Sequence, residues 1–337
     1  MKKSILILAG LASLANAALA QQAPLVVRDT GIATSSFVYD AQRNLIYAAS
    51  ANTATIAVVN PRSGTIIRSF AIPQVGSNLA LSDDDSKLYF SFGGTVDRID
   101  IATKQIDQSF SVSSGFGANV QGLSVRPGHK NTVAVQISQS AGLPFPAYGI
   151  GVFKNGVSEK TFSVSFGTPA LLQIKFSHDG NTVFGALDNS VVGYPYTTGG
   201  FSGTVTTYPS PQFLPLQLDK AKLFVGPSAF NQKTADPVGA FAVTTSVWLL
   251  APEERGNYGV AFTCGANGES PTLDVVNTAR FQDLKSFPVT GIPATFNGGV
   301  GSLKLAGKTV AFTLFNPTTF ATTLAFFDRE TNILGIP

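Results

Sequence analysis

Residues 37–49 read FVYDAQRNLIYAA, and residues 78–92 read NLALSDDDSKLYFSF. In both stretches an alternating apolar run is followed by a polar turn and then by a second apolar run. This is the pattern of two antiparallel strands joined by a tight turn. The same pattern starts again at Gly122, Gln173, Leu214, Val247 and Gly301. The chain is therefore expected to consist of repeated strand–turn–strand units.

The spacing of these units predicts the fold class. The first core residues of the second strands are Ile46, Leu88, Val133, Val183, Leu223, Val260 and Val310, and the six intervals between them average 44 residues. A period of about 40 to 50 residues is typical of a four-stranded propeller blade. We therefore predict an all-β fold, a seven-bladed β-propeller of four-stranded antiparallel blades, formed by residues 21–337 as a single domain. A pair of β-sandwiches is the alternative, and the regular period disfavours it.

Further strands fit the same repeat. Third strands are predicted at 55–59, 95–99, 272–276 and 323–327, each followed by Asn or Asp. Asn and Asp accept hydrogen bonds from the backbone of the next turn, which suits the corner between a third and a fourth strand. We also expect residues 24–27 to add an outer strand to the last blade and so close the ring.

The composition excludes several classes of protein. Of the 337 residues, 44% are hydrophobic and only 13% are charged. A disordered chain and a nucleic-acid binder built on basic patches are both excluded by these values, so no nucleic-acid partner is expected. A closed ring of sheets buries both faces of every sheet, so a chain with few charges can remain soluble in this fold.

The first twenty residues have the features of a secretory leader. Lys2 and Lys3 precede an apolar run at 5–14, and Ala18-Leu19-Ala20 forms a small-x-small cleavage site. We predict that residues 1–20 are a signal peptide and that cleavage leaves Gln21 as the first residue. An uncleaved membrane anchor is the alternative, but the apolar run is too short to span a bilayer.

Several observations fit export from a bacterial cell. Loss of the leader leaves 21 basic and 20 acidic residues, so the net charge falls from +3 to about +1. No acceptor for N-glycosylation occurs, and no later apolar run is long enough for a transmembrane segment. The single cysteine, Cys264, cannot form an intramolecular disulfide. The mature protein is expected in the periplasm or outside the cell, as a monomer.

The repeat resembles that of the YVTN family of bacterial seven-bladed propellers. Tyr47-Ala-Ala-Ser and Tyr89-Phe-Ser-Phe are similar to the second strand for which the family is named. The turns at 82–85 and 177–180 resemble its Ser-Pro-Asp-Gly turn, and residues 60–64 resemble its Asp-x-x-Thr-Gly corner. The resemblance is good over 31–112, fair over 117–195, and visible only as periodicity after about 210. It implies how the blades are built and does not imply an activity.

No catalytic residue, metal site or cofactor is predicted. His129 and His178 fall in polar turns of neighbouring blades without an acidic or cysteine ligand set, so we interpret them as ordinary turn residues. The triple Asp83-Asp84-Asp85 lacks the spacing of a calcium loop and is interpreted as a solvated turn. No Gly-x-Ser-x-Gly nucleophile elbow occurs. Propellers related to this family include quinoprotein dehydrogenases, and those that carry a cofactor use repeated tryptophans. Trp248 is the only tryptophan in this chain, which disfavours that kind of cofactor site.

A binding site is predicted at the channel mouth. In a propeller the second-to-third and fourth-to-first loops surround this mouth, and the loops assigned to it at 138–148 and 228–236 are long. Aromatic and amide groups around a depression suit a protein, peptide or glycan partner, with ordinary loop composition as the alternative. The candidate binding residues are Phe145, Tyr148, Phe230, Asn231, Asp236, Asn52, Asn78, Asn189, Glu269 and Asn316.

These observations favour an exported, non-enzymatic binding or scaffold protein of the cell envelope or exterior. The alternative is a lactonase-like hydrolase or lyase that uses the channel mouth. Acid–base chemistry needs ionisable groups near the channel, whereas binding does not, so their density there distinguishes the two hypotheses.

Overall fold

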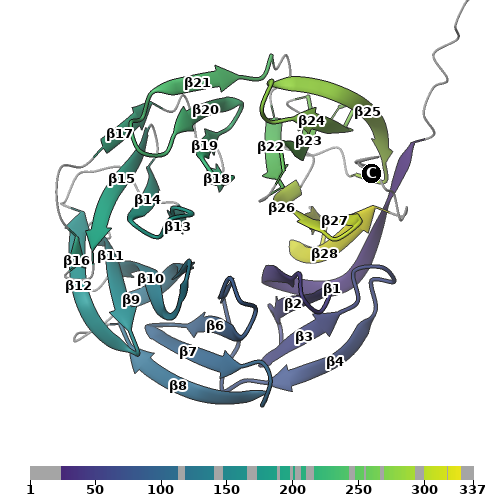
Figure 1. The fold of residues 1–337 in the computed structure, drawn as a ribbon. Helices are drawn as coiled ribbons and strands as arrows, with labels where there is room; N and C mark the ends of the chain where they lie inside the picture. The colour runs from purple at the N-terminus through teal and green to yellow at the C-terminus, as the bar shows by residue number, and fades with distance from the viewer. Residues whose placement is uncertain are drawn as a thin grey trace, which may run out of the picture.

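The computed structural model describes residues 24–112, 118–139, 147–164, 173–187, 190–197, 200–201, 206–209, 216–242, 247–253, 256–265, 269–292, 300–316 and 318–327. In this part of the chain the regular elements are β-strands, which confirms the all-β prediction. Figure 1 shows successive groups of strands arranged around a common centre. The predicted leader lies outside the described residues. No helix in the described part is long and apolar enough to cross a membrane.

The strands group into antiparallel sheets, and within each the chain passes from the innermost strand outward (Figure 1). The first groups comprise the second half of β1 (Leu25–Asp40) with β2 (Leu45–Ser50), β3 (Thr55–Val59) and β4 (Ile66–Ala71); then β5 (Asn78–Leu81), β6 (Lys87–Phe92), β7 (Thr95–Asp100) and β8 (Gln105–Ser111); then β9 (Ala118–Arg126), β10 (His129–Gln139), β11 (Ala147–Lys154) and β12 (Val157–Val164).

The later groups repeat this order. They comprise β13 (Gln173–Phe176), β14 (Thr182–Leu187), β15 (Ser190–Thr197) and β17 (Thr206–Pro209), with β16 (Gly200–Phe201) added to β15; then β18 (Leu216–Leu218), β19 (Lys222–Val225), β20 (Ser228–Asn231) and β21 (Pro237–Ala240); then β22 (Val247–Pro252), β23 (Tyr258–Cys264), β24 (Thr272–Asn277) and β25 (Gln282–Thr290); then β26 (Val300–Ala306), β27 (Thr309–Asn316) and β28 (Ala321–Phe327).

The repeat read from the sequence is the repeat of the structure. The seven marker residues, from Ile46 to Val310, all lie in second strands, and each is at most 1% exposed. The core lies between neighbouring sheets. In one cluster Tyr47 and Ile56 of the first sheet pack with Phe90 of the next. Burial of apolar side chains on both faces of each sheet is therefore the main force that holds the sheets side by side.

Strand β1 links three sheets. Leu25 and Val26 pair in parallel with Val289 and Thr290 of β25. The stretch from Val27 to Ala33 pairs antiparallel with β28, and the stretch from Thr34 to Asp40 pairs with β2. The predicted outer strand on the last sheet therefore exists, but it is formed by residues 27–33. The prediction was right about Val27 but wrong about residues 24–26, because Leu25 and Val26 pair with β25 and the apolar Leu25 is completely buried there.

The outer strands share a β-bulge. The pairing of β4, β8, β12, β21 and β25 with the preceding strand skips one outer-strand residue in each case. The skipped residues are Ile67, Asp107, Glu159, Val238 and Leu284. A bulge interrupts the row of free backbone groups at an edge, so these edges are poor templates for pairing with another chain.

Candidate functional site

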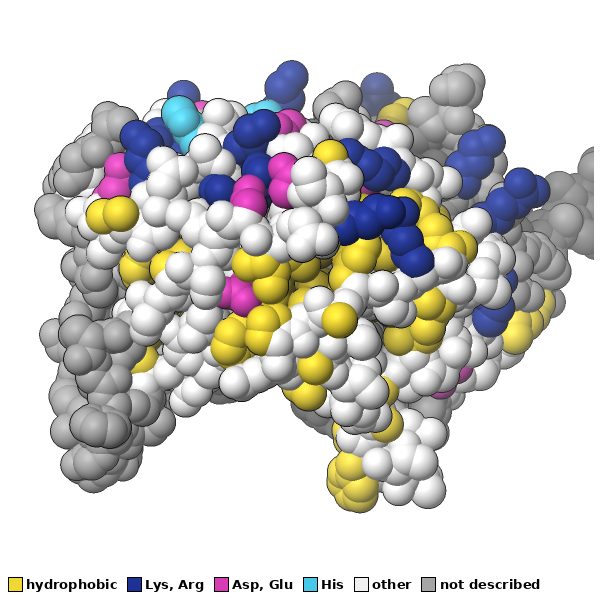
Figure 2. Space-filling view, turned by 90° about the horizontal axis from the view of Figure 1, so that it is seen from below, with side chains coloured by type: hydrophobic (Ala, Val, Ile, Leu, Met, Phe, Trp, Pro, Cys, Tyr) yellow, Lys and Arg dark blue, Asp and Glu magenta, His cyan; other side chains and the backbone are white. Residues whose placement is uncertain are grey.

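The connections between strands divide the ring into two faces. We call the side with the first-to-second and third-to-fourth turns the turn face, and the side with the second-to-third and fourth-to-first loops the mouth face. Figure 2 shows Lys, Arg, Asp, Glu and His side chains concentrated at one edge of the molecule, while uncharged side chains dominate the opposite edge. The two histidines, His129 and His178, belong to first-to-second turns, so the charged edge is the turn face.

The three aspartates of the 82–86 turn connect neighbouring sheets. The carboxylate of Asp85, which is 8% exposed, accepts a hydrogen bond from the Gln42 backbone N–H (3.0 Å). On the other side, Asp83 accepts one from the Gly128 N–H (2.8 Å), and Asp84 pairs with Lys130 (3.0 Å). The interpretation as a solvated turn holds for the exposed Asp83 and Asp84 but was wrong for the buried Asp85, and both adjacent sheets supply donors to these carboxylates.

Their environment explains the acidity of Asp84. Burial alone would raise the pKa of this carboxyl, but hydrogen bonds from Ser82, Ser86 and Lys130 outweigh burial and lower the pKa well below its ordinary value. The charge of Asp84 is thus stabilised by the fold itself. Such a carboxylate is a poor proton donor or acceptor at neutral pH.

A second charged cluster joins the β5–β8 sheet to the β9–β12 sheet. Lys87 contacts Asp100 (2.7 Å) and Asp107 (2.5 Å), and Asp107 also accepts from Arg98 Nε (2.7 Å). Arg98 in turn donates to the side chain of Asn131 on the next sheet (2.9 Å). The Lys87 hydrogen bond, together with the Thr103 backbone N–H, lowers the pKa of Asp100 to about 2. The main charged groups of this part of the turn face are therefore engaged within the fold.

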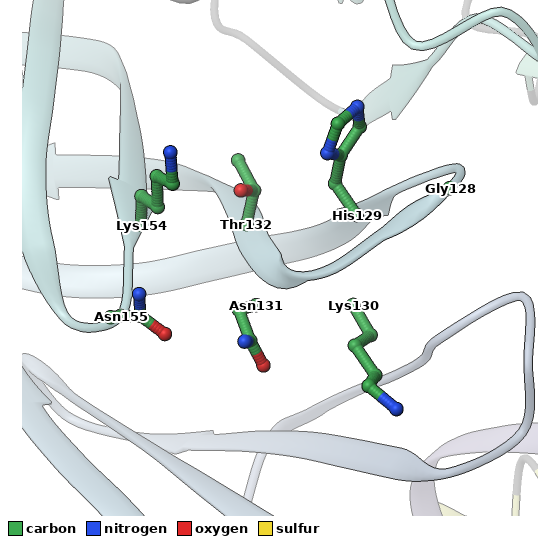
Figure 3. A pocket seen from close by; sticks show the side chains of 7 residues that line it. All are labelled: Gly128, His129, Lys130, Asn131, Thr132, Lys154 and Asn155. Carbon is green, nitrogen blue, oxygen red and sulfur yellow. The ribbon is translucent and has the colours of Figure 1, made fainter.

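The histidines do not form a metal site with their neighbours. The described residues contain no group of three or more His, Cys, Asp or Glu side chains placed to hold a metal ion. His129 lines a shallow depression of about 250 Å³ at the turn-face end of the β9–β12 sheet (Figure 3). Cys264 is completely buried, and burial raises the pKa of its thiol, so it packs as a small apolar side chain.

Four candidate residues lie on the mouth face, as predicted. Asn52 and Glu269 lie in second-to-third turns, and Asn316 ends β27 directly before such a turn. The Asn316 Oδ1 accepts from the backbone N–H groups of Thr318 and Thr319 (2.9 and 3.1 Å). Asn78 begins the innermost strand β5. Its Nδ2 donates to Ser77, to Ser91 and to the backbone carbonyl of Val120 on the next sheet (3.0 to 3.1 Å). Asn78 and Asn316 therefore have structural roles of their own.

Three candidates lie elsewhere, because the second-to-third turn of the β18–β21 sheet spans only residues 226–227. Phe230 is in the third strand, 5% exposed, with its ring edge-to-face on Tyr208 (5.9 Å). Asn231 ends the third strand and Asp236 lies in the turn before β21, so both are on the turn face. The assignment of these three residues to the mouth was wrong.

The side chains of the three remaining candidates lie outside the described part of the chain. Phe145 and Asn189 lie outside the described residues. Tyr148 has a described backbone position in β11, opposite Ser138 and Val164. Their roles in binding stay predictions.

The mouth face carries one aromatic residue that sequence reasoning missed. Phe320, in the turn between β27 and β28, is 80% exposed and has a φ of 54°. A bulky side chain rarely adopts this left-handed conformation, which costs about 1 to 3 kcal/mol and persists only where the surrounding structure imposes it. Here the Asn316 cap holds the start of the turn, and Phe315 lies edge-to-face with Phe320 at 6.2 Å. In sequence, Phe320 lies just before the predicted strand at 323–327, where an aromatic residue gives no local sign of its exposure.

Comparison with known proteins identifies the fold. No protein-family model and no curated protein matches the chain. Among solved structures, the WD40 repeats of RRP9 match with a TM-score of 0.64 and 12% identity, over 91% of this chain and 98% of that one. The structure of U3-55K gives 0.62 and 12% over 91% and 99%, and the hydrazine synthase of Kuenenia stuttgartiensis gives 0.60 and 12% over 87% and 95%. The chain thus has a WD40-like β-propeller fold. At this identity the likeness extends to the fold alone.

Proposed function

We propose that this chain is an exported, non-enzymatic binding or scaffold protein of the bacterial envelope or exterior, built as a seven-bladed propeller of the YVTN type. The blade count is supported by seven innermost strands, β1, β5, β9, β13, β18, β22 and β26, at the repeat spacing of the sequence. Export is supported by the leader pattern of residues 1–20. The partner is a protein, peptide or glycan that contacts the mouth face.

Phe320 is the observation that carries this proposal. Among the described large apolar side chains Phe320 is the most exposed, at 80%, and a partner that covered it would bury a large aromatic surface. Aromatic residues are enriched among the anchors of protein interfaces, and their removal often costs about 2 kcal/mol or more, which is roughly a 30-fold loss of affinity. The Asn316 cap fixes the backbone of the turn that carries the ring, so little backbone entropy is lost on binding.

The test uses the mature protein to probe a glycan array and a displayed peptide library. For each ligand found, we expect Phe320→Ala to weaken binding about 30-fold without a change in melting temperature. The matched control is Val157→Ala, which removes another exposed apolar side chain (70% exposed) on the outer strand β12. Equal binding by Phe320→Ala and the wild type would contradict the proposal. Turnover of a lactone by the wild type would overturn the non-enzymatic part.

A further inference from the structure

The depression at the turn-face end of the β9–β12 sheet has a distinct chemistry. It is lined by Gly128, His129, Lys130, Asn131, Thr132, Lys154 and Asn155. The lining contains three basic side chains, two amides and one hydroxyl, and no carboxylate. Asn155 and Gly156 both have positive φ values, 47° and 73°, so the hairpin after β11 is a tight turn that presents Lys154 at its base.

Alternation along the strand sorts these side chains onto two sides. Figure 3 shows the side chains of Lys154, Thr132 and His129 on one side of the β10 backbone, and those of Asn131, Lys130 and Asn155 on the other. Thr132 and Lys154 are directly opposite each other in the β10–β11 pairing. The first three side chains therefore border the same space.

The charges on the two sides differ. On the side of the β5–β8 sheet, Lys130 pairs with Asp84, Asn131 accepts from Arg98, and Gly128 N–H donates to Asp83. On the other side, Lys154 is exposed, and neither it nor His129 has a carboxylate within ion-pair distance among the described residues. Arg126, opposite His129 in register, adds another positive charge that is held by the Gly180 carbonyl (2.8 Å).

We propose that this depression binds a small oxyanion, of which phosphate is the model, between Lys154, Thr132 and His129. The Lys154 ammonium supplies charge, and the Thr132 hydroxyl and the His129 ring N–H supply hydrogen-bond donors. Charge-assisted hydrogen bonds of this kind are about twice as strong as neutral ones. Asp83 and Asp84 are held on the opposite side of the hairpin by Gly128 and Lys130, and Glu159 of β12 accepts a hydrogen bond from the Tyr196 hydroxyl.

The chain offers an internal control for the test, because it has only two histidines. Inorganic phosphate is titrated into the protein at constant pH and ionic strength, and the ring proton resonances of both histidines are followed by NMR. We expect the His129 resonance to shift with saturation while that of His178 does not move. The variant His178→Gln assigns the two signals. A second arm with methyl phosphate distinguishes a free phosphate from a phosphate ester.

Lys154→Gln is expected to weaken phosphate binding about tenfold, as for loss of one hydrogen bond to a charged group. Lys308→Gln, which removes an exposed lysine from a first-to-second turn elsewhere in the ring, should bind like the wild type. Both variants should melt like the wild type. The proposal is overturned if both histidines shift together without saturation, or if Lys154→Gln titrates like the wild type. Phe320→Ala should bind phosphate like the wild type, so the experiment tests the oxyanion site independently of the partner site proposed at the mouth face.

Discussion

Asn78 shows how single polar side chains connect the sheets near the channel mouth. It donates to the carbonyl of Val120 on the next innermost strand. At the equivalent repeat position, Ser36 accepts from the Leu79 N–H (3.2 Å) and Gln173 accepts from the Leu216 N–H (2.9 Å). Three different residue types thus perform one task, which is to satisfy a backbone group of the neighbouring sheet.

Replacement of Asn78 by Ala should destabilise the protein. The substitution removes all three hydrogen bonds of Nδ2 and leaves the Val120 carbonyl without this donor, so we expect a loss of about 1 to 3 kcal/mol. Thermal or denaturant unfolding measures it. Asn52→Ala is the matched control, since Asn52 is exposed in a turn of the same face and its backbone N–H, which Ala retains, donates to Ser50. Equal stability of the two variants would contradict the structural role of Asn78.

Asp84 should make the protein sensitive to acid. Its pKa in the folded state lies below the ordinary value of 3.8, so its ionised form favours folding above about pH 4, and this contribution is lost as the pH falls further. The side chain is 43% exposed, so the contribution is expected to stay below about 1 kcal/mol. Asp84→Asn should melt below the wild type at about pH 6, and the difference should shrink at about pH 2.5. An unchanged difference would show that the charge of Asp84 is not the cause.

At the scale of the elements, β1 is the strand on which closure depends. A single stretch pairs with β25, β28 and β2, and in Figure 1 the N-terminal strand runs past the last sheet to the first. Without it, β28 would be an unpaired edge, and such edges favour association with other chains. The chain therefore closes the ring with residues from both of its ends.

Leu25 should contribute most to this closure. Leu25→Ala removes a completely buried side chain and is expected to cost about 2 to 5 kcal/mol. Val26→Ala, at the next position of the same strand but 44% exposed, should cost less than about 1 kcal/mol. Chemical denaturation of the two variants tests the difference. Deletion of residues 21–29 should lower the melting temperature by more than either; an unchanged melt would exclude closure by this strand.

At the scale of the whole molecule, the two faces of the ring differ in the kinds of side chain that they present. Charged groups gather at the turn face (Figure 2), where ion pairs and hydrogen bonds join sheets. The mouth face presents Phe320. Binding loops on a rigid scaffold are commonly separated in this way from the parts that hold the scaffold together. With a partner bound at the mouth face, as we propose, residues that contact it could change without loss of the contacts that join the sheets.

Export is the prediction that concerns the whole chain. Protein recovered from outside the cytoplasm should begin at Gln21, because Ala18-Leu19-Ala20 fits a signal-peptidase site. Intact-mass measurement gives the result directly, and Ala20→Pro should reduce processing. Recovery of a mature form that still contains Met1 would contradict the cleavage.

The strands and their repeat could be predicted from local patterns in the sequence. Alternation along a strand and turn chemistry are local properties, so the order of residues is sufficient to place the seven marker residues and the strands around them. The Asn and Asp corners were predicted for the same reason, and Asn60 and Asn277 do accept hydrogen bonds from the following turns.

The tertiary structure alone decided which side chains meet across sheets. Asp85 and Gln42, or Asp84 and Lys130, are more than 40 residues apart, and no local pattern signals that they touch. Phe230 was misplaced because a two-residue turn shifted the strand assignment, and the exposure of Phe320 was hidden because an aromatic residue beside a strand is usually buried. The physical reason is that strand formation depends on near neighbours in the chain, whereas burial, pairing of charges and the shape of a site depend on residues that only folding brings together.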